Sequence, residues 1–250
     1  MRKRILEELQ KIEQIHNVKI IMAIESGSRA WGFASPDSDY DVRFVYVRKK
    51  EDYLKLEGIR DVIEWKLDEV LDINGWDIKK ALQLLHKSNP TIFEWCASPI
   101  VYLATPEFDV LKKALPGYFS EKKALYHYWH MAQTNYREYL KGEEVRIKKY
   151  FYVLRPLLAA QWILDKKVAP PMIFDELVDE ELDENLRPEL NRLLEMKKTL
   201  PEMGMAPKVQ VFNDYIEKVM PEIKETAEKI EETEKDWKFL NELFLQFINN

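Results

Sequence analysis

Apolar residues near the start of the chain follow two different spacings. From about Arg4 to His16 they recur every three or four positions, which predicts an amphipathic helix. Four later segments, rich in β-branched and aromatic residues, predict strands: 18–25, 39–48, 62–66 and 70–73. Helical patterns return at 78–86 and 90–96. This mixture predicts an α/β (α+β) fold in which helices pack on a small mixed sheet.

The second half of the chain contains helical patterns alone. The pair Pro116-Gly117 favours a turn and marks a domain boundary. Three long helices are predicted, over 120–141, over 144–166 and from about 211 to 248. Pro156 falls inside the second of these and predicts a kink or a break there. We therefore expect a sheet-containing domain over residues 1–115 and an all-helical domain over residues 116–250.

The strongest chemical pattern lies where the second strand begins. Asp39 and Asp41 are separated by one residue, and strand side chains alternate between faces, so both carboxylates project to the same side. The residues on the other side are apolar or aromatic and can pack on a core: Tyr40, Val42, Phe44 and Tyr46. Adjacent carboxylates repel each other, and a divalent cation such as Mg²⁺ removes that cost. The pattern predicts a metal site at Asp39 and Asp41.

The turn after the first strand supplies a partner for that site. Gly27 has no Cβ, so a phosphate can approach its backbone closely. The N–H groups of Ser28 and Arg29 would point at that phosphate if a helix begins near Arg29, and the Ser28 hydroxyl can donate to it. A metal beside a bound triphosphate is the arrangement of a phosphoryl-transfer or nucleotidyl-transfer site.

The run Gly-Ser-Arg-Ala-Trp-Gly-Phe-Ala-Ser-Pro-Asp-Ser-Asp-Tyr-Asp-Val-Arg, residues 27–43, resembles the signature of the DNA polymerase β-like nucleotidyltransferase superfamily. It is similar to a bacterial and phage subfamily of predicted nucleotidyltransferases, some of which are associated with RNA repair. The resemblance implies a polymerase β-like catalytic domain followed by a helical domain. It also implies transfer of a nucleoside monophosphate from an NTP to a hydroxyl, with two Mg²⁺ ions, or Mn²⁺ in their place, as cofactors.

The superfamily also uses a third carboxylate on a neighbouring strand. Asp72 is the preferred candidate because it ends an apolar segment just before a helix, and Glu64 is the alternative. The resemblance implies that Asp39 and Asp41 hold both metal ions. Asp72 would hold one of them and deprotonate the attacking hydroxyl. Arg43 shares the face of the aspartates, and we expect it to pair with one of them rather than to bind phosphate.

A second distinctive stretch lies in the helical half of the chain. At helical spacing Lys148, Tyr152 and Arg155 share a face, as do Lys149 and Tyr152. In superfamily members with a helical second domain, one helix lends Lys, Tyr and Arg side chains to the triphosphate and the base. The resemblance therefore implies that Lys149, Tyr152 and Arg155 bind the nucleotide. An ordinary solvated basic face is the alternative.

Other residues that can carry chemistry are expected to be structural. Trp31 and Trp76 can stack on a base, but tryptophan in a chain that is 46% hydrophobic belongs more often to the core. His127 and His130 are three residues apart on a helix, without the further ligands that a metal site needs. Cys96 lies among apolar helix residues and is expected to be buried and inert.

Composition limits the partners. The chain has 250 residues, a net charge of −6 and one cysteine. No run of about 18 apolar residues occurs, so we expect no membrane partner and a cytoplasmic location. The negative charge argues against extensive nucleic-acid binding but allows a local basic groove. An RNA end, such as that of a tRNA, is the acceptor that the subfamily association implies.

Two alternatives to an RNA acceptor stay open at this point. The same chemistry suits nucleotidylation of a protein or of a small molecule such as an antibiotic. A non-catalytic, antitoxin-like nucleotide-binding protein is the other alternative, although the intact motif argues against it. The sequence does not indicate the oligomeric state.

Overall fold

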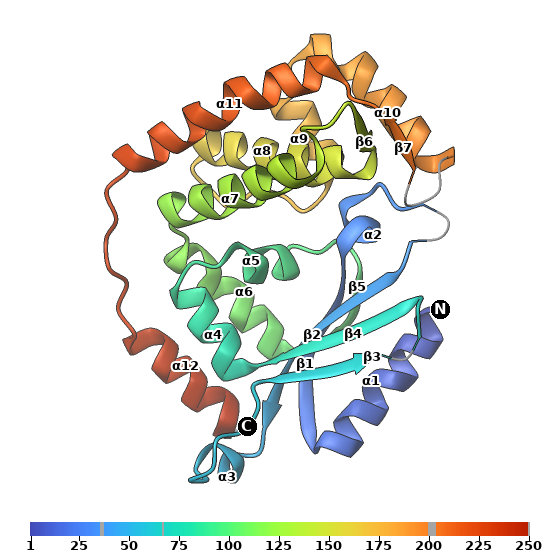
Figure 1. Ribbon diagram of the computed structural model, residues 1–250. Helices are drawn as coiled ribbons and strands as arrows, with labels where there is room; N and C mark the ends of the chain where they lie inside the picture. The colour runs from blue at the N-terminus through green and yellow to red at the C-terminus, as the bar shows by residue number, and fades with distance from the viewer. Residues whose placement is uncertain (36–37, 67, 200–203, 250) are drawn as a thin grey trace. The chain divides into compact units, whose positions relative to one another are not determined.

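A computed structural model describes residues 1–35, 38–66, 68–199 and 204–249. The chain forms two compact units, one comprising Met1–Tyr118 and Glu234–Asn250, and the other Phe119–Thr233 (Figure 1). The first boundary lies close to the predicted one at residues 115 and 116. The expectation that 116–250 forms one helical domain is wrong for the last segment, because Glu234–Asn250 belongs to the sheet-containing unit.

The first unit is built on a mixed five-stranded sheet with the order β3-β4-β2-β1-β5. The bounds of its strands are β1 Val18–Ser26, β2 Tyr40–Arg48, β3 Val62–Lys66, β4 Leu71–Asp77 and β5 Val101–Ala104. Strands β2 and β4 are parallel, and the other neighbours are antiparallel. The α/β prediction with a small mixed sheet is therefore confirmed. Strand β4 extends well beyond the predicted segment 70–73.

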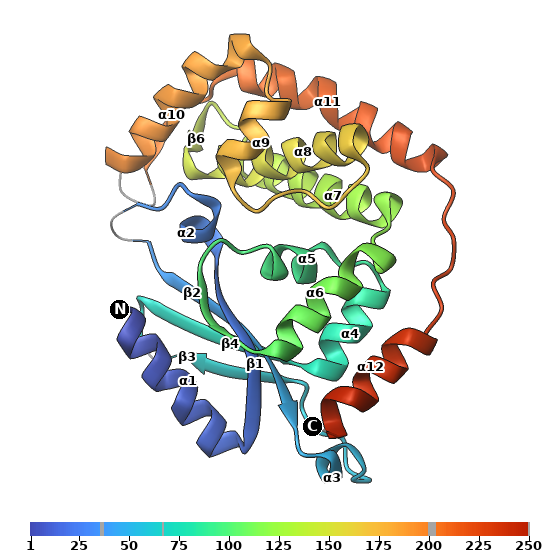
Figure 2. The same ribbon diagram turned by 180° about the vertical axis from the view of Figure 1, so that it is seen from behind.

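Helix α1, Arg2–His16, packs on one face of the sheet (Figures 1 and 2). Its apolar positions join a buried cluster that includes Val42, Phe44 and Tyr46 of β2, with Tyr40 packed against it. These are the side chains that the alternation along β2 directs away from Asp41. The predicted division of β2 into a core face and an acidic face is thus confirmed at Asp41.

The other face is covered by helices α4 (Ile78–His86), α5 (Pro90–Cys96) and α6 (Pro106–Tyr118), which contact β1, β2 or β4. Asp77 caps α4 by accepting a hydrogen bond from the Lys79 N–H at 2.8 Å, as its position before the helix predicts. Short helices α2 (Gly27–Trp31) and α3 (Lys50–Tyr53) flank the long strands.

The C-terminal helix α12, Lys238–Asn249, completes the first unit by packing on α4 and β2. The segment before it is fixed by aromatic stacking. The rings of His86 and Trp237 are 3.5 Å apart between centroids, and the His86 ring lies 2.8 Å from the carbonyl oxygen of Lys235. The Tyr118 hydroxyl donates to the carbonyl oxygen of Asp236 at 3.0 Å. These contacts explain why the end of the chain belongs to this unit.

The second unit is mainly helical. Its helices are α7 Glu121–Tyr139, α8 Lys148–Lys166, α9 Phe174–Glu181, η1 Glu184–Leu186, α10 Arg187–Thr199 and α11 Gln210–Lys229. A kink or a break was predicted at Pro156, and the structure excludes the break, because α8 continues through that residue. A two-stranded antiparallel ladder of β6 (Glu144–Arg146) and β7 (Met205–Pro207) corrects the all-helical expectation.

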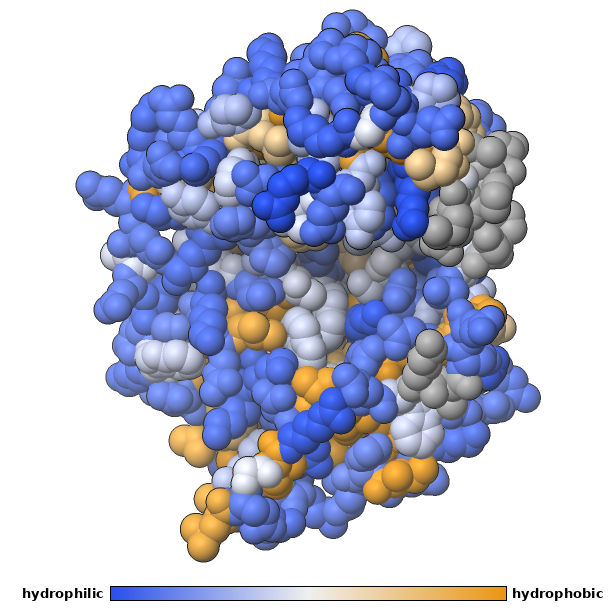
Figure 3. All heavy atoms as spheres, in the orientation of Figure 1, coloured by the Kyte–Doolittle hydropathy of each residue, from blue (hydrophilic) through white to orange (hydrophobic). Residues whose placement is uncertain are grey.

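The surface shown in Figure 3 is mostly hydrophilic, and apolar side chains appear there in small groups. In the part of the chain that the structure describes, none of the helices combines the length and the apolar character needed to span a bilayer.

Candidate active site

The end of β1 and the start of β2 bring the glycine turn against Asp41. The two strands are antiparallel, and Ser26 lies opposite Asp41 in their register. Gly27 follows with φ +63°, a conformation that favours glycine. A Cβ atom at Gly27 would lie 2.2 Å from Oδ2 of Asp41, so the turn and the carboxylate are in direct proximity.

Asp72 lies opposite Asp41 on the neighbouring parallel strand. Register partners share a face of the sheet, so the two carboxylates face the same side. Glu64 is on β3, which is separated from β2 by β4, and it lies opposite Asn74. Its exposed carboxylate is bound to Arg60 at 2.6 Å. The geometry therefore favours Asp72 over Glu64 as the third carboxylate.

Arg43 joins the two carboxylates. Its Nη2 donates to Oδ1 of Asp41 and to Oδ2 of Asp72, each at 3.0 Å. Its Nη1 donates to the carbonyl oxygens of Val42, at 3.0 Å, and of Asp72, at 3.2 Å. Asn74 donates to the other carboxylate oxygen of Asp72 at 2.7 Å. The expected pairing of Arg43 with an aspartate is confirmed, and it extends to a second one.

Asp39 lies just outside β2, whose first residue is Tyr40, and its side chain is exposed. Within the described residues, no three His, Cys, Asp or Glu side chains converge as a metal-binding group. The predicted set of Asp39, Asp41 and Asp72 is thus not assembled as a metal-binding group. The Arg43 guanidinium contacts both Asp41 and Asp72.

The chemistry of these side chains nevertheless fits a divalent cation. Burial raises the pKa of the Asp41 carboxyl; Arg43 opposes that shift, and the negative charges of Asp72 and Asp39 add to it. A carboxylate that is desolvated and repelled by two others gains from an additional positive charge. Carboxylate oxygens are also the hard ligands that Mg²⁺ prefers.

Glu25 is a buried residue that the sequence did not single out, and it is hydrogen-bonded to the backbone of Asp41. The side chain of Glu25 is fully buried, and its Oε1 accepts the Asp41 backbone N–H at 2.8 Å. Its Oε2 is hydrogen-bonded to the Tyr102 hydroxyl, and Ser98 Oγ donates to its backbone carbonyl at 2.6 Å. Burial raises the pKa of the Glu25 carboxyl. An acidic residue directly after the apolar run 20–24 of β1 was the available signal.

We expect Glu25→Leu to lower the free energy of unfolding by about 2–5 kcal/mol, because it leaves the Asp41 N–H and the Tyr102 hydroxyl without their buried partner. Glu25→Gln is the matched control. Its amide oxygen can still accept the Asp41 N–H, so we expect a smaller loss. Urea unfolding of both variants tests this difference, and equal losses would show that the hydrogen bond to Asp41 contributes nothing.

Arg29 holds the segment before β2 in place. Its Nε donates to the Asp39 carbonyl oxygen at 3.0 Å, and its guanidinium lies 3.8 Å from the centre of the Tyr40 ring.

Helix α2 begins at Gly27, slightly earlier than the predicted start near Arg29. The first N–H groups of a helix have no acceptor within it, which leaves those of Gly27, Ser28 and Arg29 suited to a ligand. Phosphate binding by Gly27, Ser28 and Arg29 stays a prediction.

In the second unit, Lys149 and Tyr152 lie together on α8. The Lys149 ammonium lies 3.8 Å from the centre of the Tyr139 ring and 5.1 Å from that of Tyr152. Burial and the nearby charge of Arg146 lower the pKa of Lys149. Tyr152 is 38% exposed, so it is accessible for stacking. Nucleotide binding by Lys149 and Tyr152 stays a prediction.

Arg155 is placed differently from its neighbours on α8. It is only 2% exposed, and its Nη2 donates to the carbonyl oxygen of Met172 at 3.3 Å. A buried guanidinium cannot reach a ligand without repacking the helices around it. The prediction that Arg155 binds the nucleotide is therefore corrected, and its role in the described structure is internal.

The remaining candidates have structural environments. The rings of Trp31 and Phe33 are 5.6 Å apart, and Trp76 stacks on Trp95 at 3.8 Å between centroids, so both tryptophans pack on protein as expected. Cys96 is buried, which raises the pKa of its thiol to about 12. A thiol with that pKa is not nucleophilic near neutral pH, in agreement with the predicted inertness.

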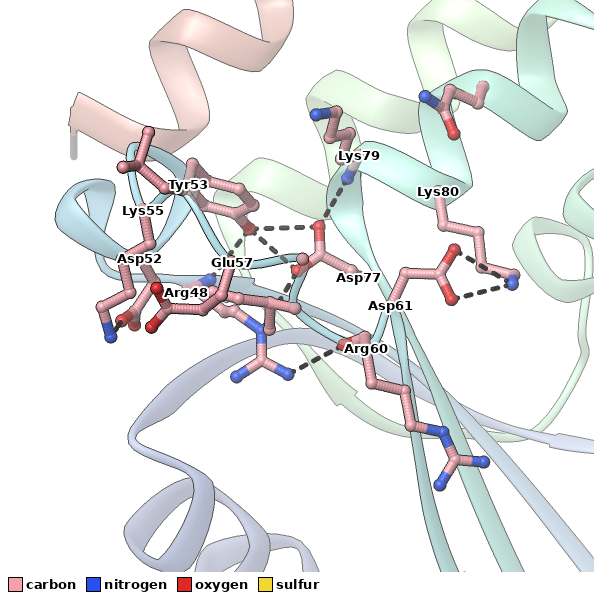
Figure 4. A pocket seen from close by; sticks show the side chains of 14 residues that line it. Arg48, Asp52, Tyr53, Lys55, Glu57, Arg60, Asp61, Asp77, Lys79 and Lys80 are labelled. Atoms are coloured by element: carbon pink, nitrogen blue, oxygen red, sulfur yellow. Dashed lines mark hydrogen bonds and ion pairs between the residues drawn. The ribbon is translucent and has the colours of Figure 1, made fainter.

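A polar cavity of about 410 Å³ lies at the opposite end of β2 and β4 from the aspartates (Figure 4). Arg48 and Asp77 lie at its inner side, and their side chains approach to 3.6 Å. The Tyr53 hydroxyl is hydrogen-bonded to both carboxylate oxygens of Asp77, at 3.1 and 3.2 Å. These contacts hold the end of β2 and the end of α3 to Asp77, the residue before α4. The cavity is therefore separate from the aspartate site.

Comparison with known proteins shows the family of the chain. The family described as RNA repair pathway DNA polymerase beta family matches residues 1–246. A relative from Bacillus subtilis (strain 168), Uncharacterized protein YcgL, is 46% identical over 251 residues, or 99% of this chain and 96% of the relative. The crystal structure of a nucleotidyltransferase-like protein from Exiguobacterium sibiricum 255-15 aligns with a TM-score of 0.30 and 14% identity, over 88% of this chain and 73% of that chain. The family match confirms the resemblance predicted from residues 27–43.

Proposed function

Because the chain belongs to the RNA repair pathway DNA polymerase beta family, we propose that it is a metal-dependent nucleotidyltransferase acting on an NTP. The observation that carries this proposal is the position of Asp41. It lies against the Gly27 turn on one side and opposite Asp72 on the other. The turn that is predicted to bind phosphate thereby lies beside the carboxylates of Asp41 and Asp72 at one end of the sheet.

In the proposed reaction the oxygen of an acceptor hydroxyl forms a bond to the α-phosphorus of the NTP. The bond between that phosphorus and the bridging oxygen of pyrophosphate breaks, and Asp72 accepts the hydroxyl proton. The Ser28 hydroxyl and the N–H groups at the start of α2 bind the β- and γ-phosphates. Asp39, Asp41 and Asp72 would hold two Mg²⁺ ions, or Mn²⁺ in their place. Bound metal ions neutralise charge on the attacking and leaving oxygens.

The acceptor we propose is an RNA end. The support for it is the family description, which refers to RNA repair. We propose a cytoplasmic location for the chain, because its single cysteine excludes an intrachain disulfide. That location suits an RNA acceptor. A hydroxyl of a protein or of a small molecule is chemically equivalent, so the experiment must offer all three acceptor classes.

The test is to incubate the full chain and Mg²⁺ with each NTP in turn, labelled at the α-phosphate, and with tRNA, a protein mixture or an aminoglycoside. We expect label to appear in the RNA, and to be lost when EDTA is added. The double variant Asp39→Asn, Asp41→Asn is the control for contaminating enzymes. Label on another acceptor class would exclude RNA as the substrate. Transfer that survives both EDTA and the double variant would exclude the proposed site.

A further inference from the structure

Arg43 is placed where a cation is needed. One nitrogen of its guanidinium, Nη2, lies 3.0 Å from a carboxylate oxygen of Asp41 and 3.0 Å from one of Asp72. The three side chains come from two adjacent strands, because Arg43 follows Asp41 on β2 and Asp72 lies opposite on β4. The Arg43 side chain is 18% exposed, and those of Asp41 and Asp72 are 32% and 37% exposed, so this contact is only partly shielded from solvent.

A guanidinium in this position competes with a metal ion. A divalent cation that binds the same oxygens of Asp41 and Asp72 must displace Nη2 from them. The bonds from Nη1 to the carbonyl oxygens of Val42 and Asp72 do not involve the carboxylates and can persist. The displaced charge therefore stays beside the site.

We propose that Arg43 is the resident counter-ion of the Asp41–Asp72 pair, and that metal binding displaces its guanidinium toward the anionic triphosphate. This inference rests on the proposed function, because it concerns the metal and the nucleotide of that site. Its consequence is that the metal and the nucleotide bind cooperatively. A metal ion that binds these oxygens of Asp41 and Asp72 must displace Arg43, and a bound triphosphate offers the displaced guanidinium a new partner.

The first test measures Mn²⁺ binding alone, by calorimetry or by electron paramagnetic resonance, with no nucleotide present. We expect Arg43→Gln to bind Mn²⁺ about tenfold more tightly than the unaltered chain, because a competing charge-assisted pair is removed. A purely structural role for Arg43 predicts the opposite sign, since a disordered site would bind metal more weakly. Arg60→Gln is the matched control, because Arg60 pairs with Glu64 away from the site. We expect that control to leave Mn²⁺ affinity unchanged.

The second test repeats the titration with a non-hydrolysable NTP analogue. The analogue should raise the Mn²⁺ affinity of the unaltered chain, and this gain should be smaller in Arg43→Gln. If Arg43→Gln does not fold, Arg43→Lys replaces it. Lysine keeps the positive charge, but its single ammonium cannot reproduce the contacts of the guanidinium with both carboxylates and the backbone carbonyls. We expect an intermediate Mn²⁺ affinity for Arg43→Lys.

The outcomes separate the two proposals. If neither the unaltered chain nor Arg43→Gln binds Mn²⁺, with or without the NTP analogue, the proposed metal-dependent function is wrong. If the unaltered chain binds Mn²⁺ and Arg43→Gln binds it equally or more weakly, Arg43 is not a resident counter-ion, and the proposed function stands.

Discussion

Asp72→Asn is expected to lower the rate of nucleotidyl transfer by about 10²–10⁴-fold, the range for loss of a general base. Asp72 lies opposite Asp41 on the adjacent strand and is bound to the same guanidinium of Arg43. The Asn amide oxygen can still accept from Arg43, so the variant should fold. The rate is measured by label transfer from the NTP at saturating Mg²⁺, with the unfolding midpoint recorded for each protein.

Glu64→Gln is the matched control for Asp72→Asn. Glu64 lies on β3, opposite Asn74, and its exposed carboxylate pairs with Arg60. We expect this variant to retain the transfer rate of the unaltered chain. A large loss in Glu64→Gln together with an active Asp72→Asn would assign the third carboxylate to Glu64 and overturn the geometry proposed for the site.

The fold of the first unit could be predicted because its strands have simple patterns. Alternation along residues 40–46 separates a core face from an acidic face, and the structure places Val42, Phe44 and Tyr46 in the buried cluster beneath α1. Strand β4 is longer than its pattern suggests, since it continues through Gly75. A Cβ atom at Gly75 would lie 2.1 Å from the Phe44 ring, so that glycine allows a close approach of β4 to the core. A single sequence does not reveal such a contact.

The domain assignment of the last helix could not be predicted from periodicity. Helix α12 has an apolar face, but spacing shows only that the face is buried and not which unit buries it. The contacts that decide the question are between residues far apart in the chain, such as His86 with Trp237 and Tyr118 with Asp236.

Which of the candidate site residues are buried could not be predicted from spacing either. Helical spacing places Lys149, Tyr152 and Arg155 on related faces of α8, yet Arg155 is buried and Tyr152 is exposed. An arginine is mostly solvated unless it is paired, so its burial follows from the surrounding packing rather than from its own sequence position. Glu25 was missed for a related reason, because its partners, the Asp41 N–H and Tyr102, become neighbours only when β1 pairs with β2 and β5.

Gly27→Ala is expected to lower nucleotidyl transfer by about 100-fold, the cost of misplacing a reacting group by roughly an ångström. The new Cβ would lie 2.2 Å from Oδ2 of Asp41, so the carboxylate must move. The φ of +63° at Gly27 adds strain of about 1–2 kcal/mol for any residue with a Cβ. Label transfer and metal affinity measure the effect of moving the Asp41 carboxylate. Urea unfolding measures the strain at position 27.

The control for Gly27→Ala is Gly117→Ala. A Cβ at Gly117 has open space around it, and Gly117 lies within helix α6. Alanine there should raise the free energy of unfolding by about 0.5–1 kcal/mol and leave transfer unchanged. Full activity in Gly27→Ala would mean that Asp41 can be displaced from the turn without consequence. The contact between the turn and Asp41 would then be incidental to phosphate and metal binding, and the observation on which the proposed function rests would lose its force.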